Sequence, residues 1–141
     1  MGEMREILFR GKRKDNGKWV EGHYGEYYSG KENVSCISIP KETISGSLCY
    51  DVIPETVGQY TGLTDKNGRR VFEGDILHAA QGDFVVRWSE SICSFVAGEK
   101  ERMRPCMNSG TMNCCEVIGN IFDNPELLES DIHKVKTAES E

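Results

Sequence analysis

The sequence has no long hydrophobic run and no excess of positive charge. The short apolar stretch Ile7-Leu8-Phe9 near its start is far below the length of a signal-peptide core or a membrane span. We therefore expect a cytoplasmic protein that does not enter a membrane. Lys and Arg number 17 against 23 Asp and Glu, which gives a net charge of -6. This balance argues against binding duplex DNA through clustered positive charge.

Catalytic and metal-binding signatures are also missing. The chain contains no G-x-S-x-G, Walker-type, G-x-G-x-x-G or H-E-x-x-H pattern, so we expect no enzymatic activity. None of its six cysteines forms a C-x-x-C pair, and the adjacent Cys114 and Cys115 are badly spaced to chelate zinc. We predict buried or incidental thiols, no metal and no cofactor. A metal-assisted enzyme built on His78, with Asp75 or Asp83 and a thiol, is the least favoured hypothesis.

The composition indicates one domain or two small modules built from short strands. The chain has 141 residues, of which 38% are hydrophobic and 28% charged, enough for a core and a solvated surface. Fifteen glycines against 4 prolines favour many tight turns.

Two Asn-Gly pairs predict hairpins. Asn16-Gly17 lies between apolar-rich segments 7–12 and 18–24, and Asn67-Gly68 lies between 60–63 and 70–77. Asn-Gly is typical of a type I′ turn, which joins two antiparallel strands through two residues of positive φ. We expect this turn type at both places.

Strands separated by turns dominate the remaining chain, so the predicted fold class is mainly β. Pro40 is expected to stop one strand, Pro54 to open a helical turn, and Asn124 to cap a helix that starts at Pro125. The expected further strands are 34–40, 83–88, 92–97 and 115–122. The stretch 22–33 is predicted as loop, 99–113 shows no clean period, and the charged tail 129–141 is expected to be flexible. Residues 71–122 hold the elements of a small closed barrel.

Two groups of side chains are candidates for binding. The basic residues Lys12, Arg13 and Lys14, with Trp19 beside them, and the turn residues Arg69 and Arg70 suggest single-stranded nucleic acid. The same basic residues could instead protect strand edges from aggregation. Exposed aromatic residues would be the anchors for a protein partner, although Trp19 and Tyr24 could equally fill the core of the first hairpin. The proposed anchors are Trp19, Tyr24, Tyr27 and Tyr28.

Several phrases, in this order and spacing, resemble the YopX family of phage and prophage proteins. They span about Met4 to Leu128, but none falls between Tyr24 and Asp51. The phrases are Phe9-Arg10-Gly11-Lys12, Trp19-Val20-Glu21-Gly22, Val57 to Leu63 with Asp65 to Gly68, Glu73-Gly74-Asp75-Ile76, and Val117 to Leu128.

The resemblance implies a mainly β protein with an N-terminal α+β portion and a C-terminal SH3-like small β-barrel. With the opening β-hairpin and the charged end of the chain, we predict an α+β/hairpin portion over 1–60, the barrel over 61–128, and a charged tail over 129–141. The resemblance implies no established activity and no catalytic residues. Together with the composition, it predicts a small phage or prophage accessory protein that acts as a non-enzymatic interaction module for a host or phage protein. Binding of single-stranded DNA or RNA through the basic turns is the alternative, and a homo-oligomer stays open.

Overall fold

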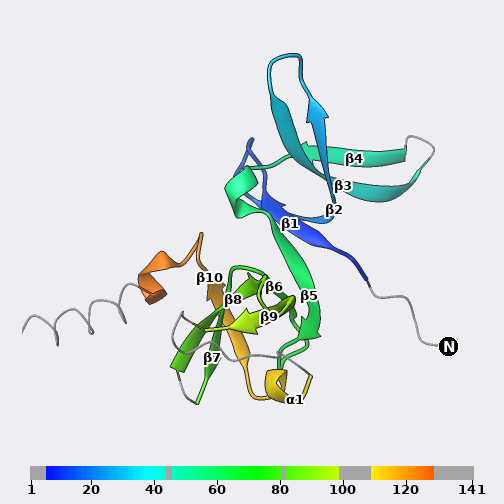
Figure 1. The fold of residues 1–141 in the computed structure, drawn as a ribbon. Helices are drawn as coiled ribbons and strands as arrows, with labels where there is room; N and C mark the ends of the chain where they lie inside the picture. Colours follow the sequence, from blue (N-terminus) through cyan, green and yellow to red (C-terminus); the bar gives the residue numbers. More distant parts are fainter. Residues whose placement is uncertain (1–5, 44–45, 81, 99–108, 129–141) are drawn as a thin grey trace, which may run out of the picture. The chain divides into compact units, whose positions relative to one another are not determined.

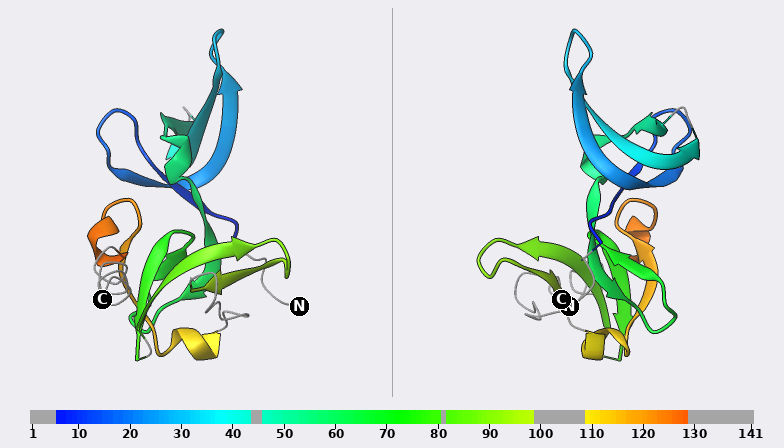
Figure 2. Two further views of the ribbon diagram at one scale, coloured as in Figure 1. Left: turned by 60° about the vertical axis from the view of Figure 1, so that its left-hand side comes forward. Right: turned by 90° about the vertical axis from the view of Figure 1, so that its right-hand side faces the viewer.

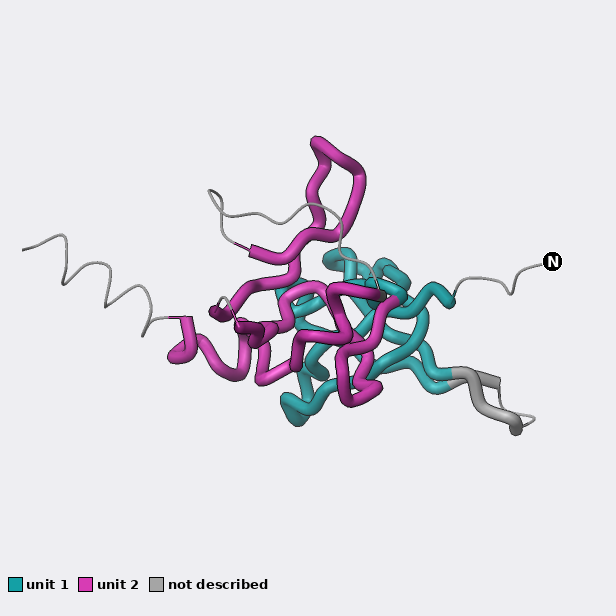
Figure 3. Tube along the Cα trace, turned by 90° about the horizontal axis from the view of Figure 1, so that it is seen from below, with its two compact units in different colours: residues 1–62 teal, residues 63–141 magenta. Residues whose placement is uncertain are grey.

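The computed structural model describes residues 6–43, 46–80, 82–98 and 109–128. The chain divides into two compact units, residues 1–62 and 63–141, which Figure 3 draws in teal and magenta. Two of the predicted segments lie outside the described residues. They are the tail 129–141, predicted to be flexible, and most of 99–113, for which the sequence shows no regular period. None of the described helices is long and apolar enough to cross a bilayer.

Unit 1 is an antiparallel sheet made by the first part of the chain (Figure 1). Strand β1 (Phe9–Lys12) pairs with β2 (Trp19–Tyr28) on one side and with β5 (Gly58–Thr64) on the other. Strand β3 (Asn33–Thr43) pairs with β2 and with β4 (Gly46–Asp51). The spatial order β4-β3-β2-β1-β5-β6 places β2 and β3 among the inner strands of the sheet.

The core of unit 1 is small and comes from three buried aliphatic residues. Val20, Ile37 and Val52 are buried together, and four partly buried apolar side chains pack around them. These four are Phe9, Ile39, Tyr50 and Val57. The predicted helical turn is present as the 3₁₀ turn η1 (Pro54–Thr56). It is the one helical segment among the described residues of unit 1, so the expected α+β character is not found there.

Both Asn-Gly pairs lie in hairpin turns, but the expected type I′ geometry is wrong. Gly17 and Gly68 have φ values of 71° and 80°, whereas Cys93 alone among the described non-glycine residues has a positive φ. In the second turn, Gly68 N–H donates to the Asp65 carbonyl at 3.0 Å and Asp65 N–H to the Arg69 carbonyl at 2.9 Å. This is a three-residue loop with glycine in the left-handed region, which requires one residue of positive φ instead of two.

Strand β2 is much longer than the sequence predicts. Residues 22–28, expected as loop, continue the strand and pair with β3 from His23–Ser38 to Tyr28–Asn33. Both faces of this segment are largely exposed beyond Gly22, so no two-residue period of apolar residues marks it as a strand. Pairing with β3 decides its conformation. At Gly22 a Cβ atom would lie 2.3 Å from the Ser38 carbonyl oxygen, so glycine permits the close approach of β3.

Strand β3 also continues past Pro40, which does not stop it as expected. Its pairing with β2 has ended at Ser38, so the missing N–H of Pro40 interrupts no bond to that strand. Pro40 pairs with Ser47 of β4, and the register shifts between Pro40 and Thr43. The proline therefore coincides with an irregularity in the ladder instead of its end.

Unit 2 contains a four-stranded antiparallel sheet in the order β10-β7-β8-β9. Its strands are β7 (Asp75–Ala79), β8 (Gly82–Ser89), β9 (Ser94–Ala97) and β10 (Glu116–Asn120). The short strand β6 (Arg70–Phe72) precedes β7 and belongs to the other sheet. The described strands therefore form two open sheets, and the closed barrel expected over 71–122 is not found among them.

The core of unit 2 is larger than that of unit 1 and includes a residue that the sequence reading missed. The short helix α1 (Ser109–Met112), in a region without a clean period, contributes the buried Met112. Leu63, Phe84 and Cys115 pack against the edge of this core. Its buried members are Val71, Leu77, Val86, Ala97, Met112 and Val117.

The Asp65 carboxylate joins the second hairpin turn to the last strand. Its Oδ1 accepts the N–H groups of Asn67 and Arg69, and its Oδ2 accepts the N–H of Val117, each at 2.9 Å. Burial alone would raise the pKa of Asp65, but these three amides and the Arg69 charge outweigh it and lower the pKa below its ordinary value. Asp65 thus connects parts of unit 2 that lie 52 residues apart in the chain.

A second side-chain turn ends strand β10. The Asn120 Oδ1 accepts the N–H groups of Phe122 and Asp123, and the Asn124 Oδ1 accepts the N–H of Asn120 at 3.2 Å. Helical residues begin at Pro125 as expected, although the Asn124 side chain bonds backward to Asn120. A Cβ at Gly119 would lie 2.4 Å from Asn124 Oδ1, so glycine is needed for this turn.

We expect Asp65→Asn to destabilise unit 2 by about 2 to 3 kcal/mol, because hydrogen bonds to a charged acceptor are among the stronger ones. The asparagine side chain can also turn its own N–H toward the Val117 N–H, so that two donors face each other and neither forms a hydrogen bond. Urea unfolding measures the loss. Glu126→Gln, at an exposed residue of the same unit, is the control and should change stability by less than about 0.5 kcal/mol.

The lowered pKa of Asp65 predicts a dependence on pH. A carboxyl group whose folded pKa lies below its unfolded value stabilises the fold fully above the unfolded pKa of about 3.9. This contribution is lost as the pH falls through the folded pKa. The difference in unfolding free energy between the wild type and Asp65→Asn should therefore shrink from pH 6 toward pH 3. A constant difference would contradict an ionised Asp65.

Candidate interaction surface

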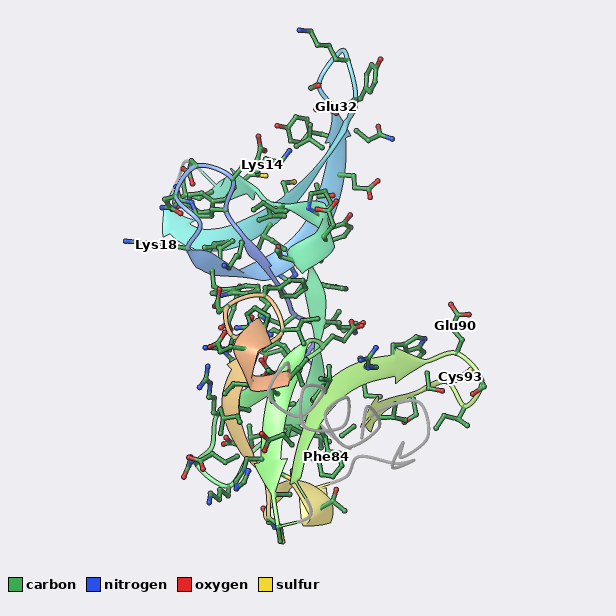
Figure 4. All side chains as sticks on the ribbon, turned by 90° about the vertical axis from the view of Figure 1, so that its left-hand side faces the viewer. Lys14, Lys18, Glu32, Phe84, Glu90 and Cys93 are labelled. Atoms are coloured by element: carbon green, nitrogen blue, oxygen red, sulfur yellow. The ribbon has the colours of Figure 1, made fainter. Side chains whose placement is uncertain are left out.

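The hairpin of β2 and β3 carries the most exposed aromatic side chains of unit 1. Tyr24, Tyr27 and Tyr28 are 37%, 43% and 68% exposed. In both views of Figure 2 the two strands extend away from the rest of their unit, and Glu32, labelled in Figure 4, lies in the loop at their tip. Large exposed aromatic residues gathered on one element are typical of an interaction site.

Tyr24 is held in place by polar and apolar contacts. Its hydroxyl donates to Glu26 Oε1 at 2.7 Å and lies 3.1 Å from the Ser35 hydroxyl, while its ring lies 5.7 Å from that of Phe9. The Ser35 contact lowers the pKa of the phenol, but the hydrogen bond to Glu26, burial and the Glu26 charge raise it more. Tyr24 therefore stays protonated and fixed against a carboxylate.

Tyr27 makes a similar pair with Asp51 of strand β4. Its hydroxyl donates to Asp51 Oδ1 at 2.8 Å, and this hydrogen bond raises the pKa of the phenol. Because side chains alternate along a strand, Tyr27 lies on the opposite face of β2 from Tyr24. Both faces of the hairpin thus present a tyrosine bonded to a carboxylate. Asp51 also lines a hollow of about 350 Å³, together with Lys14, Asp15, Cys49 and Tyr50.

Trp19, predicted as an anchor, is partly buried among cations instead. The guanidinium of Arg10 lies 4.6 Å from the centre of its ring, and the ammonium of Lys12 lies 5.7 Å from it. Arg10 itself is buried. These cation–π contacts join Trp19 of strand β2 to two side chains of strand β1.

Arg13 is likewise engaged within unit 1. Its Nε donates to Asp15 Oδ1 at 2.9 Å, and its guanidinium lies 4.1 Å from the centre of the Tyr50 ring. The hydrogen bond to Asp15 raises the pKa of Arg13 and lowers that of Asp15. Lys14 and Lys18 are exposed in the same turn, where Figure 4 labels them.

The other predicted basic residues belong to unit 2. Arg69 and Arg70 are exposed, and the Arg69 N–H helps to hold Asp65. Lys66 in the same turn forms an ion pair with Glu116 of β10, with 3.7 Å between Nζ and Oε2. The predicted basic set is thus divided between two units, and each half includes cations that already contact carboxylates or rings.

The histidine of the metal hypothesis, His78, pairs with an aspartate across two strands of unit 2. His78 Nδ1 lies 2.7 Å from Asp83 Oδ1 across strands β7 and β8, at the surface. Asp75 is buried, and its Oδ2 accepts the Phe72 N–H at 2.8 Å. Over the described ranges, no three His, Cys, Asp or Glu side chains are grouped to hold a metal ion.

The sequence reading missed one exposed apolar pair in unit 2. Trp88 is 48% and Ile92 47% exposed on the hairpin of β8 and β9. The Phe95 ring meets Trp88 edge-on, with 5.0 Å between ring centres. The sequence predicts a strand over 83–88 that ends at Trp88, without a role for its ring. The polar residues 89–91 that follow Trp88 are the signal that could have indicated exposure.

Comparison with known proteins agrees with the family resemblance. The family model described as YopX protein matches residues 8–129. The chain belongs to the YopX family. No curated protein matches this member of the family. Among solved structures, the crystal structure of protein EF1440 from Enterococcus faecalis is similar, with a TM-score of 0.59 and 22% identity. The match covers 89% of this chain and 99% of that one, and at this identity it supports the fold alone.

We expect Cys36, beneath the Tyr27 face of the hairpin, to resist alkylation at pH 8. Burial, the neighbouring Cys49 thiol and the Asp51 charge raise the pKa of Cys36 to about 11. The thiolate is the reacting form, so roughly one Cys36 in a thousand would be reactive at this pH. Iodoacetamide labelling followed by peptide mass spectrometry should modify the exposed Cys49 and Cys93 first. Equal labelling rates for Cys36 and Cys49 in the folded protein would contradict the raised pKa of Cys36.

Proposed function

We propose that this YopX-family protein is a non-enzymatic protein-interaction module that binds its partner through the β2–β3 hairpin. The observation that carries the proposal is the row of exposed tyrosines on this hairpin. Tyrosine loses little conformational entropy on binding and combines an apolar ring with a polar tip, so it is a frequent anchor at interfaces.

The rigidity of the hairpin supports this role. Six consecutive residue pairs join β2 to β3, from His23–Ser38 to Tyr28–Asn33, and β4 flanks β3. The hydrogen bonds of Tyr24 and Tyr27 fix two of the three rings before a partner arrives. Anchors that are ordered in the free protein lose less entropy on association.

The negative charges on the hairpin make nucleic acid a less favoured ligand there than a protein. Glu26, Glu32 and Asp51 are exposed on the hairpin strands, their loop and the adjoining β4, where a phosphate backbone would be repelled. The exposed Lys14 and Lys18 in the β1–β2 turn favour nucleic acid binding there instead. A stacking role for Trp19 has less support because Arg10 and Lys12 already lie over its ring.

The remaining finer expectations belong to the same proposal. We infer an accessory protein of phage or prophage origin that works in the bacterial cytoplasm on a host or phage protein. An SH3-like arrangement of unit 2 stays a prediction.

Affinity capture from bacterial lysate with matched variants tests the proposal. The full-length protein should retain a specific protein after nuclease treatment. Tyr27→Ser/Tyr28→Ser should reduce its recovery at least about tenfold, as expected when interface anchors are truncated. Lys14→Ser/Lys18→Ser, a double substitution in the β1–β2 turn, is the control and should leave recovery within about twofold.

The opposite pattern would overturn the proposal. If nuclease abolishes capture and the lysine variant rather than the tyrosine variant loses it, the basic turn binds nucleic acid. Circular dichroism and urea unfolding of both variants establish that each is folded before capture is compared.

A further inference from the structure

One face of the β2–β3 hairpin has the chemistry of a receptor for a cationic side chain. On strand β2, Tyr24, Glu26 and Tyr28 are spaced two residues apart, so all three side chains leave the same face. Successive members are about 7 Å apart along the strand. We propose that this face, called here the Tyr-Glu-Tyr face, binds an arginine side chain of the partner protein. The inference rests on the proposed function and specifies what the hairpin recognises.

The Glu26 carboxylate is oriented before any ligand binds. Its Oε1 accepts the Tyr24 hydroxyl at 2.7 Å, and that hydroxyl is in turn 3.1 Å from the Ser35 hydroxyl on β3. Ser35 is also the residue directly opposite Glu26 in the ladder. A carboxylate has about four acceptor positions, so one phenol bond leaves capacity for further donors.

Aromatic surface lies on both sides of this carboxylate. Tyr24 is 37% exposed with its ring against Phe9, and Tyr28, at 68%, is the most exposed large hydrophobic residue in the part of the chain that the structure describes. A guanidinium bonded to Glu26 can stack on a neighbouring tyrosine ring, which adds a cation–π contact to a charge-assisted hydrogen bond. Glu26 between two tyrosines therefore offers both interactions to one planar cation.

Arginine fits this face better than the other ligands that a protein or nucleic acid could present. Its planar group can stack on a ring and donate to a carboxylate at once, whereas the compact, strongly hydrated lysine ammonium gains less from a ring. Phosphates and acidic peptides would be repelled by the exposed carboxylate of Glu26 at the centre of the face. Charge complementarity thus favours a segment of the partner that carries arginine.

Matched peptides test the inference on the full-length protein. The probes are a Gly-Ser peptide containing three arginines, the same peptide with three lysines, and a single-stranded oligonucleotide. Binding is followed by amide chemical-shift titration. We expect the arginine peptide to shift the amides of 24–28 and 33–37 and to bind at least about threefold more tightly than the lysine peptide.

Two variants locate the contact. Glu26→Gln and Tyr28→Leu should each weaken the arginine peptide about fivefold, because each removes one of the two interactions. Glu32→Gln is the matched control, since it removes the same charge four residues from Tyr28 in the exposed loop, and it should change affinity less than twofold. The amide spectra of the variants report whether the hairpin keeps its fold.

Several results would overturn the inference. These are equal binding of the lysine peptide, an equal loss in Glu32→Gln and Glu26→Gln, tighter binding of the oligonucleotide, or no shifts with millimolar arginine peptide. If lysate capture still depends on Tyr27 and Tyr28 in that case, the interaction module stands and the arginine preference alone fails. If capture is also independent of the hairpin, the proposed function fails as well.

Discussion

The continuous register between β2 and β3 is the constraint on which the candidate surface depends. Pairing from His23–Ser38 to Tyr28–Asn33 sets the alternation that separates Tyr24 from Tyr27. A slip of one residue would exchange these faces and would separate Tyr24 from Ser35. The close approach of Ser38 to Gly22 lies at the base of this pairing and admits no side chain there. The arrangement of side chains on the candidate surface is thus a consequence of how tightly one end of the ladder is specified.

Unit 2 achieves order differently, through side chains that bond to the backbone. Asp65 ties the turn at Asn67 and Arg69 to β10, and Asn120 exchanges bonds with the segment that follows it. Such bonds satisfy backbone groups at turns, where no neighbouring strand can do so. They allow a small core to support short strands, and they explain why polar residues at these positions are buried.

The sequence predicted the existence of most strands because local rules decide them, and it failed where tertiary contacts decide. The prediction that Gly17 and Gly68 lie in hairpin turns is confirmed. The turn type depends on which residues of the flanking strands pair last, and the Asn-Gly pair alone does not specify this. Residues 22–28 show no two-residue period of apolar residues, and pairing with β3 makes them a strand. The tyrosines of the candidate surface, Tyr24, Tyr27 and Tyr28, were named from the sequence and are exposed. The side chains that contact Trp19 and Arg13 could be found only in three dimensions.

The division between family phrases and candidate surface follows from these physical roles. The phrases that resemble the YopX family contain Gly22, Asp65, Gly68 and Gly119, which serve close approaches, positive φ or buried hydrogen bonds. Residues between Tyr24 and Asp51 carry no such phrase, yet they form the exposed hairpin and the strand that supports it. Positions that specify a fold tolerate few side chains, while an exposed strand paired through its backbone tolerates many. The exposed side chains of the hairpin can therefore change while the positions that specify the fold stay the same.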